Sequence, residues 1–184
     1  MRIVGGDCKG RKLSAPAGRD TRPTSDRTRE SLFNILRHGI GFQLEDTRVM
    51  DLFAGSGALG LEALSRGAAA CIFIDRAQSA KKCIEDNLTA LALTDRGGVL
   101  KLDAAHLPPR SAEVAPAHLA FLDPPYGQGL ATTTLTSLHR GEWLAEKALI
   151  VVETGETEDF SAPAPYTLAD QRTYGAARIS FLQI

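Results

Sequence analysis

The sequence predicts an α/β protein with a doubly wound, mostly parallel sheet, a C-terminal antiparallel hairpin and a short basic N-terminal extension. Three observations predict this class: short apolar segments alternate with amphipathic ones from Arg48 onward, a glycine-rich stretch follows the first apolar segment, and turn-forming residues dominate the start of the chain. The length of 184 residues, 43% of them hydrophobic, is enough for one domain with its own core. We therefore expect a domain over residues 47–184 and, before it, an extension over residues 1–46 that contains a hairpin and a helix.

The extension begins with closely spaced glycines, which favour turns. Arg2–Val4 and Arg11–Leu13 flank these turns, so we expect them to pair as a short hairpin. In the segment that follows, apolar side chains recur with helical spacing. This pattern predicts a helix from about Ser25 to His38, ended by Gly39.

Beyond the extension, the alternation of strands and helices is typical of βαβ units with parallel strands. The expected strands are Arg48–Phe53, Ala69–Ile74, Val99–Leu102, His118–Leu122 and Ala148–Val152. The expected helices are Ala58–Arg66, Ala77–Leu93 and Leu130–Leu138, with further helical material over Glu142–Glu146. Two last extended segments, Tyr166–Arg172 and Ala177–Leu182, are joined around Tyr174-Gly175 and predict the terminal hairpin.

Composition argues against several classes of protein. No apolar stretch is long enough for a membrane helix, and the first residues are polar and basic, unlike those of a signal peptide. Cys8, Cys71 and Cys83 are scattered and form no CxxC pair, which favours a reducing compartment. Neither the cysteines nor the four histidines have metal-ligand spacing. We expect a cytoplasmic protein without a metal ion, and a monomer because no pattern indicates a dimer seam.

Charge is unevenly distributed along the chain. Residues 1–37 contain nine Lys and Arg against four acidic residues, so this segment has a net charge of +5 and the remainder one of −6. A basic segment on an acidic body suggests a polyanionic partner such as nucleic acid. A solvated charged surface would give the same pattern, so charge alone leaves both interpretations open.

Candidate ligand-binding residues follow the predicted strands, because open parallel sheets bind ligands at the carboxyl ends of their strands. Gly55, Gly57 and Gly60 form a G-x-G-x-x-G pattern between a strand and a helix, where the backbone can approach a ligand closely. Asp75 follows the second strand, where a carboxylate can accept hydrogen bonds from ribose hydroxyls, and Asp103 follows the third. Each of these two acids could instead cap a helix.

Asp51 is the first of two features that distinguish the ligand classes that such a loop can bind, and the end of the fourth strand is the decisive one. A nicotinamide enzyme would place a pyrophosphate here, and a carboxylate four residues before the first glycine is unfavourable beside that group. A cationic ligand such as S-adenosylmethionine, with its ammonium and sulfonium groups, suits Asp51 better. A nicotinamide-dependent oxidoreductase is therefore the less favoured alternative.

The fourth predicted strand ends in Asp123-Pro124-Pro125-Tyr126. The two prolines make this segment stiff, because each fixes φ. The Asp123 carboxylate and the Pro124 carbonyl can accept hydrogen bonds from one planar amino group, while the Tyr126 ring stacks on the base that carries it. Two aligned acceptors would hold a poorly nucleophilic exocyclic amine with its lone pair facing a methyl donor. The segment therefore predicts methyl transfer to an amine.

These motifs resemble known methyltransferases. Asp51–Gly60 resembles the first motif of the Rossmann-like, S-adenosylmethionine-dependent enzymes, and Asp123–Tyr126 resembles the (D/N)PP(Y/F/W) signature of those that act on amines. Further segments are similar to the RsmD family, namely Arg2–Gly6, Gly10–Leu13, Arg22–Thr24, Arg29–Leu36 and Phe53–Gly67. The resemblance covers essentially the whole chain. It implies transfer of a methyl group to the N2 amine of a guanine in 16S ribosomal RNA, whether free, in an assembly intermediate or in the small subunit.

The resemblance also implies roles for individual residues. The cofactor would be bound by Asp51, Phe53, Ala54, Gly55, Ser56, Gly57, Gly60, Asp75, Arg76, Asp103, Ala104 and Asp123. The target amine would be held by the catalytic residues Asp123, Pro124, Pro125 and Tyr126, where the family often has Phe at the last position. As a hypothesis for the basic extension, RNA phosphates would be contacted by Arg2, Lys9, Arg11, Lys12, Arg22 and Arg27. Arg29 and Arg37 fit either RNA contacts or ordinary charges on a helix surface.

Two other functions stay open on the sequence. The protein could methylate an amine of DNA adenine or of a protein glutamine, although no segment looks free for the target-recognition region that DNA enzymes usually carry. It could also be a non-catalytic RNA-binding assembly protein, an interpretation that the intact Asp123–Tyr126 segment disfavours. Residues 105–117 and 155–165 support no functional prediction.

Overall fold

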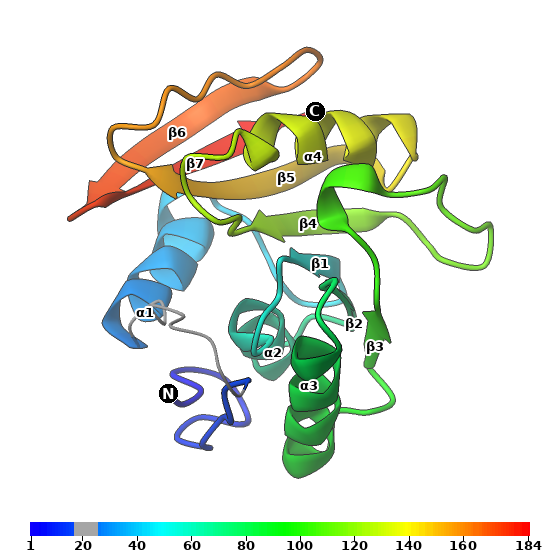
Figure 1. Ribbon diagram of the computed structural model, residues 1–184. Coiled ribbons are helices and arrows are strands. Elements are labelled where there is room, and N and C mark those ends of the chain that lie inside the picture. The colour runs from blue at the N-terminus through cyan, green and yellow to red at the C-terminus, as the bar shows by residue number, and fades with distance from the viewer. Residues whose placement is uncertain (17–25) are drawn as a thin grey trace.

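A seven-stranded mixed sheet with the strand order β3-β2-β1-β4-β5-β7-β6 forms the centre of the protein (Figure 1). The computed structural model describes residues 1–16 and 26–184. The strands are β1 Arg48–Leu52, β2 Ala70–Ile74, β3 Gly97–Leu100, β4 Ala117–Leu122, β5 Leu144–Gly155, β6 Thr167–Tyr174 and β7 Ala177–Gln183. The first five run parallel to one another, and β7 pairs antiparallel with both β5 and β6. The predicted fold class is therefore confirmed.

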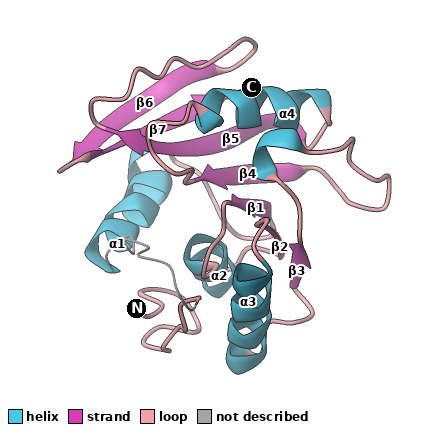
Figure 2. Ribbon diagram, in the orientation of Figure 1, coloured by secondary structure: helices cyan, strands magenta, loops and turns pink. Residues whose placement is uncertain are grey.

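Helices cover both faces of this sheet (Figure 2). They are α1 Asp26–Asn34, a π-helical turn Ile35–Gly39, α2 Ala58–Ser65, α3 Gln78–Leu91, a 3-10 helix Ala104–His106 and α4 Leu130–Arg140. Successive strand residues point to opposite faces: Val49 and Phe121 belong to the core under α1, α2 and α3, whereas Met50 and Leu122 belong to the core under α4. Both faces are apolar, as expected of a parallel sheet buried between helices.

The register of the parallel strands aligns their carboxyl ends. Leu52 pairs with both Ile74 and Leu122, and Leu122 pairs in turn with Val152. The residue after each of these last paired positions therefore lies at one edge of the sheet. Across β2, β4 and β5 these following residues are Asp75, Asp123 and Glu153, which brings three acidic side chains to the same edge.

The N-terminal extension packs on the sheet domain and shares its core. Ile3, Leu13 and Phe33 are buried in the same cluster as strand residues of β1, β4 and β7. The predicted hairpin exists as a single antiparallel bridge between Arg2 and Lys12. The helix predicted from Ser25 to His38 is described from Asp26 onward: α1 ends at Asn34, and a π-helical turn continues it to Gly39, the residue expected to end it. The boundary at residue 46 stays a prediction.

Two elements differ from the prediction. Glu142–Glu146 is not helical: Gly141 ends α4, the Trp143 carbonyl accepts a hydrogen bond from the Ala117 N–H at 2.9 Å, and β5 begins at Leu144. This segment joins the sheet because the edge of β4 offers it backbone partners. The third strand also begins two residues earlier than expected, at Gly97. None of the helices described in residues 1–16 and 26–184 is long and apolar enough to cross a membrane.

Candidate active site

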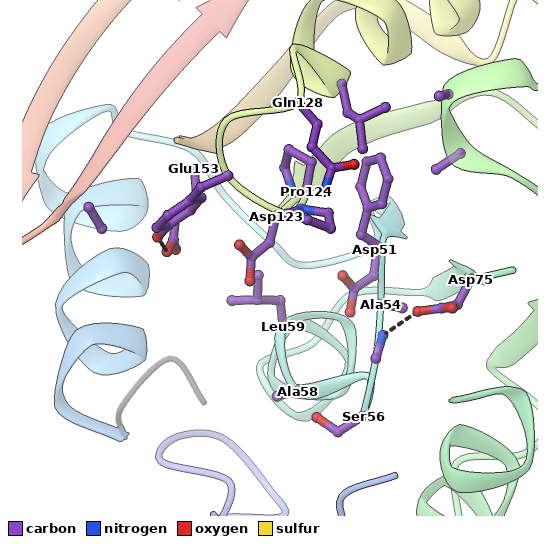
Figure 3. A pocket seen from close by; sticks show the side chains of 18 of the residues that line it. Asp51, Ala54, Ser56, Ala58, Leu59, Asp75, Asp123, Pro124, Gln128 and Glu153 are labelled. Atoms are coloured by element: carbon purple, nitrogen blue, oxygen red, sulfur yellow. Dashed lines mark hydrogen bonds between the residues drawn. The ribbon is translucent and has the colours of Figure 1, made fainter. Parts of the chain in front are cut away.

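A cavity of about 860 Å³ opens at the carboxyl ends of the parallel strands (Figure 3). Its size is in the range of small-molecule and cofactor pockets. Most of the site residues predicted from the sequence line it, namely Asp51, Phe53, Ala54, Gly55, Ser56, Asp75, Arg76, Asp103, Ala104, Asp123, Pro124, Pro125 and Tyr126. Gly57 and Gly60 are not among the lining residues.

The glycine-rich loop turns sharply between β1 and α2. Gly55 and Gly57 have φ values of +57° and +77°, a region that glycine adopts without a steric penalty. The Gly55 N–H donates to the Asp75 carboxylate at 3.0 Å, so the loop is fixed to the end of β2. Gly60 has a packing role, because a Cβ there would lie 2.3 Å from the Phe73 ring. Because glycine has no Cβ atom, α2 can pack closely on β2 at this position.

Asp51 lies beneath this loop and is almost fully buried, with 2% exposure. Its Oδ2 accepts a hydrogen bond from the Gly60 N–H at 2.9 Å. The pKa of Asp51 is raised to about 8, chiefly by burial; the Gly60 hydrogen bond opposes this rise, and the nearby charges of Asp123 and Asp75 add to it. A buried acid under negative neighbours is stabilised in its charged form by a cation. The position therefore fits a positively charged group in the cavity.

Asp75 and Asp103 occupy the positions at the strand ends that the sequence indicated. The two oxygens of Asp75 accept hydrogen bonds from the N–H groups of Gly55 and Ala77, at 3.0 and 2.8 Å. Asp103 caps the 3-10 helix through the Ala105 N–H and contacts His106, whose hydrogen bond lowers the pKa of Asp103. Both acids thus have capping roles and also line the cavity, so the two alternatives from the sequence do not exclude each other.

The Asp123–Tyr126 segment forms another wall of the same cavity. Burial, followed by the charge of Glu153, raises the pKa of Asp123 to about 7. Tyr126 is 45% exposed, and its hydroxyl donates to Glu153 Oε1 at 2.5 Å. The Gly127 N–H that follows donates to Glu158 at 3.1 Å. The segment is therefore anchored to β5 and to the turn beyond it while the aromatic ring stays accessible.

Five carboxylates line the cavity, and four of them, all except Asp103, lie in the order of the strands that carry them or that they follow. Figure 3 shows Glu153, Asp123, Asp51 and Asp75 in sequence across the pocket, from β5 through β4 and β1 to the end of β2. These negatively charged acceptors favour a ligand with cationic groups and hydroxyls, and disfavour a pyrophosphate. The residues present therefore fit S-adenosylmethionine. In the described part of the chain, no group of three or more His, Cys, Asp or Glu side chains could hold a metal ion.

Some cavity residues were not predicted from the sequence. Glu153 is the most informative, because it directly follows the predicted strand Ala148–Val152, as Asp75 and Asp123 follow theirs. Several others flank the predicted residues along the chain, namely Ala58, Leu59, Ala105, His106, Gln128 and Leu130. The rest come from the extension and the C-terminal hairpin, namely Met1, Thr28, Arg29 and Tyr174 to Ala177. No local pattern marks these residues. They reach the cavity only because the fold brings both ends of the chain to its rim.

Of the predicted RNA-binding residues, those that the structure describes lie on the extension but outside the cavity lining. Lys9, Lys12 and Arg27 are exposed. Arg2 is exposed and forms an ion pair with Asp26 at 3.1 Å. Arg11 is exposed and donates to the Ala90 carbonyl at the end of α3. Arg22 falls outside the described residues.

Arg29 is neither an exposed RNA contact nor a charge on the helix surface, the two interpretations that the sequence allowed. Its side chain is fully buried, contacts Asp26 at 3.0 Å and lies 3.5 Å from Glu62 of α2. Glu62 is equally buried and accepts hydrogen bonds from the Val4 N–H and from Arg66, at 2.8 and 2.7 Å. These contacts tie the extension to the helix that follows the glycine-rich loop.

Comparisons with known proteins agree with this geometry. A family model described as "Conserved hypothetical protein 95" matches residues 1–183. The chain is 38% identical over 177 residues to Ribosomal RNA small subunit methyltransferase D of Escherichia coli strain K12, covering 95% of this chain and 85% of that protein. It is 39% identical over 186 residues to YlbH of Bacillus subtilis strain 168, covering 98% and 97% of the two chains.

The fold agrees as closely as the sequence. The solved structure of the Escherichia coli yhhF protein superposes with a TM-score of 0.81 at 35% identity, over 100% of this chain and 97% of that one. Family model, curated relatives and solved structure therefore match nearly the whole chain rather than the cofactor-binding motif alone. The chain belongs to this family, the RsmD family of Rossmann-like methyltransferases.

Proposed function

We propose that the protein transfers a methyl group from S-adenosylmethionine to the N2 amine of a guanine in 16S ribosomal RNA. The observation that carries this proposal is the placement of Asp123–Tyr126 in the wall of an acid-lined cavity. A cofactor side and an amine-binding side thus share one space. The similarity to the Escherichia coli enzyme named for the small-subunit ribosomal RNA supports the choice of substrate.

The cofactor side would be formed by the glycine-rich loop and the acids at the ends of β1, β2 and β3. Asp51 lies where it would stabilise the cationic methionine part, Asp75 would accept hydrogen bonds from the ribose, and Asp103 with Ala104 would flank the adenine. When bound, S-adenosylmethionine supplies an electrophilic methyl group on a positively charged sulfur. Gly55, with its positive φ, lets the loop backbone approach the ligand.

The amine side would be formed by the segment after β4. Asp123 and the Pro124 carbonyl would accept the two hydrogens of the guanine amine, which aims its lone pair at the methyl group, and Tyr126 would stack on the base. Asp123 also has a means to take up the proton that the nitrogen loses on methylation, since burial and Glu153 raise its pKa to about 7. The acceleration would come mainly from positioning.

The RNA would reach the cavity across the basic extension. Lys9, Arg11, Lys12 and Arg27 are exposed there, and Met1 and Thr28 of the same extension line the cavity. Contacts to phosphates orient an RNA without recognising its sequence. The target guanine must also leave its stack to reach the pocket, so an accessible loop base is favoured. A ribosomal RNA substrate would place the reaction in the cytoplasm.

The proposal is tested by methyl transfer from labelled S-adenosylmethionine to small ribosomal subunits and to naked 16S RNA, both from a strain lacking this activity. The digested RNA is analysed for modified nucleosides. The proposal predicts label in N2-methylguanosine, and the better acceptor identifies the stage of assembly. Label in another nucleoside, or no label while the cofactor still binds, would contradict it and direct the search to DNA, protein or small-molecule amines.

A further inference from the structure

Glu153 lies beside Asp123 at the amine end of the cavity, where the proposed reaction gives it no direct contact with the base. Leu122 of β4 pairs with Val152 of β5, so the next residue on each strand is a carboxylate at the same edge of the sheet. Neighbouring strands lie about 4.8 Å apart. Both side chains line the cavity and are adjacent in it (Figure 3). A ligand group held by Asp123 therefore lies within reach of Glu153.

One oxygen of Glu153 is fixed and the other is available. Oε1 accepts the hydrogen bond from the Tyr126 hydroxyl at 2.5 Å. Oε2 accepts no hydrogen bond from residues 1–16 and 26–184. Since Tyr126 is the ring proposed to stack on the base, its hydroxyl holds the Glu153 carboxylate at the side of that base. Oε2 can then accept a hydrogen bond from a ligand.

The Watson–Crick edge of guanine presents two neighbouring donors. The N2 amine and the N1–H lie side by side, and both donate. Adenine and 2-aminopurine present an N1 lone pair instead, which repels a carboxylate. Two adjacent carboxylates therefore match guanine and oppose a base without N1–H, as sites built to accept a substrate N–H reject analogues that lack it.

We infer that Glu153 selects guanine by accepting a hydrogen bond from its N1–H, next to the N2 amine held by Asp123. This inference rests on the proposed function and adds a residue that determines base specificity. Glu153 could instead serve only to anchor the loop that carries Tyr126. That role explains less, because Glu158 already anchors this loop by accepting hydrogen bonds from the Gly127 and Gly155 N–H groups at 3.1 and 3.3 Å. Glu158 is not among the residues that line the cavity.

The test replaces a single guanine in the RNA. Once the methylated nucleotide is mapped, ligated 16S RNA carries either guanine or 2-aminopurine there; the analogue keeps the reactive 2-amine but has no N1–H. Rates of methyl transfer at limiting RNA are compared for the wild type and for Glu153→Gln, whose amide can donate to the analogue's N1. The wild type should prefer guanine by at least about 10-fold, the size expected for one charged hydrogen bond. Glu153→Gln should lose most of that preference.

The analogue also lacks the O6 atom of guanine, but this affects both proteins alike and cancels when the two preferences are compared. Glu158→Gln is the matched control, since it perturbs the same loop outside the cavity, and it should keep the wild-type preference. Glu153→Ala removes the acceptor altogether and should lose the preference too. Cofactor affinity, measured for each variant, reports on folding.

The outcomes separate this inference from the proposed function. A wild type that forms no N2-methylguanosine contradicts the proposed function. If the wild type methylates guanine, and Glu153→Gln and Glu153→Ala prefer guanine over 2-aminopurine as strongly as the wild type does, the role of Glu153 alone is overturned. The loss of preference in both Glu153 variants but not in Glu158→Gln is the result that the inference requires.

Discussion

The buried ion pair between the extension and α2 predicts a large effect of Glu62→Ala on stability. Glu62 and Arg29 are both fully buried, and Glu62 also accepts the Val4 N–H and the Arg66 guanidinium. Removal of the carboxylate leaves the positive charge of Arg29 in the core without this counterion, and removes the acceptor from a backbone N–H. Breaking a buried pair in this way costs about 3–5 kcal/mol.

Such a loss is a large share of the roughly 5–15 kcal/mol that stabilises a typical domain. Urea unfolding measures it, as a fall in the midpoint at an unchanged slope. Because the extension shares the hydrophobic core of the sheet, we expect one cooperative transition in both proteins.

A matched variant provides the control. Glu85→Ala removes an exposed carboxylate 3.7 Å from Lys81 on α3, and pairs of this kind contribute about 0.5 kcal/mol or less. A loss below about 1 kcal/mol for Glu62→Ala would refute the reasoning, because it would mean that the carboxylate stabilises the core no more than a surface pair does. A separate early transition would show instead that the extension unfolds independently of the sheet.

Two further predictions concern the ligands. Burial raises the pKa of Asp51 to about 8, so this acid is largely neutral at pH 6 and ionises as the pH rises; a cationic cofactor favours the ionised form. Affinity for S-adenosylmethionine should therefore increase from pH 6 to pH 8 with release of a proton, which calorimetry in buffers of different ionisation enthalpy can measure. Asp51→Asn should make the affinity less dependent on pH. If the affinity of the wild type depended on pH as little as that of the variant, the prediction would be contradicted. Reversal of charge at Arg11 and Lys12 should weaken RNA binding and reduce its salt slope by about one unit for each phosphate that the extension no longer neutralises. Reversal at Lys82, an exposed residue paired with Asp86 on α3, should leave the slope unchanged, and an equal change in both variants would show that the extension is not the RNA-binding surface.

The order of strands and helices could be predicted because each signal is local. Alternating apolar segments, a glycine pattern and acids after strands identified the sheet and most of the cavity lining. Glu153 obeys a similar rule to Asp75 and Asp123, since it follows Val152, the last residue of β5 that pairs with β4. The signal for Glu153 is therefore local too, although the acids predicted to bind a ligand after a strand were Asp75, Asp103 and Asp123 alone.

Other features depend on contacts between distant residues. The apolar neighbours of Glu62 on α2 indicate a buried acid, but its partner Arg29 lies in another helix and is set only by tertiary packing. The start of β5 is similar: Glu142–Glu146 has no strand pattern of its own, and Leu144 becomes a strand residue by pairing with Ala117. The local sequence favours a helix there, but pairing with the free edge of β4 makes the segment part of a strand instead.

The most direct test of the central claim compares the wild type with Asp123→Ala in two assays on the same preparations. Equilibrium binding measures the affinity for S-adenosylmethionine, and single-turnover transfer to the RNA acceptor measures the chemical step. The account predicts that affinity is largely retained while the transfer rate falls by about 100-fold or more, because Asp123 aligns the amine. An unchanged rate would contradict its role in the reaction, and a joint loss of binding and transfer would mean that Asp123 is structural.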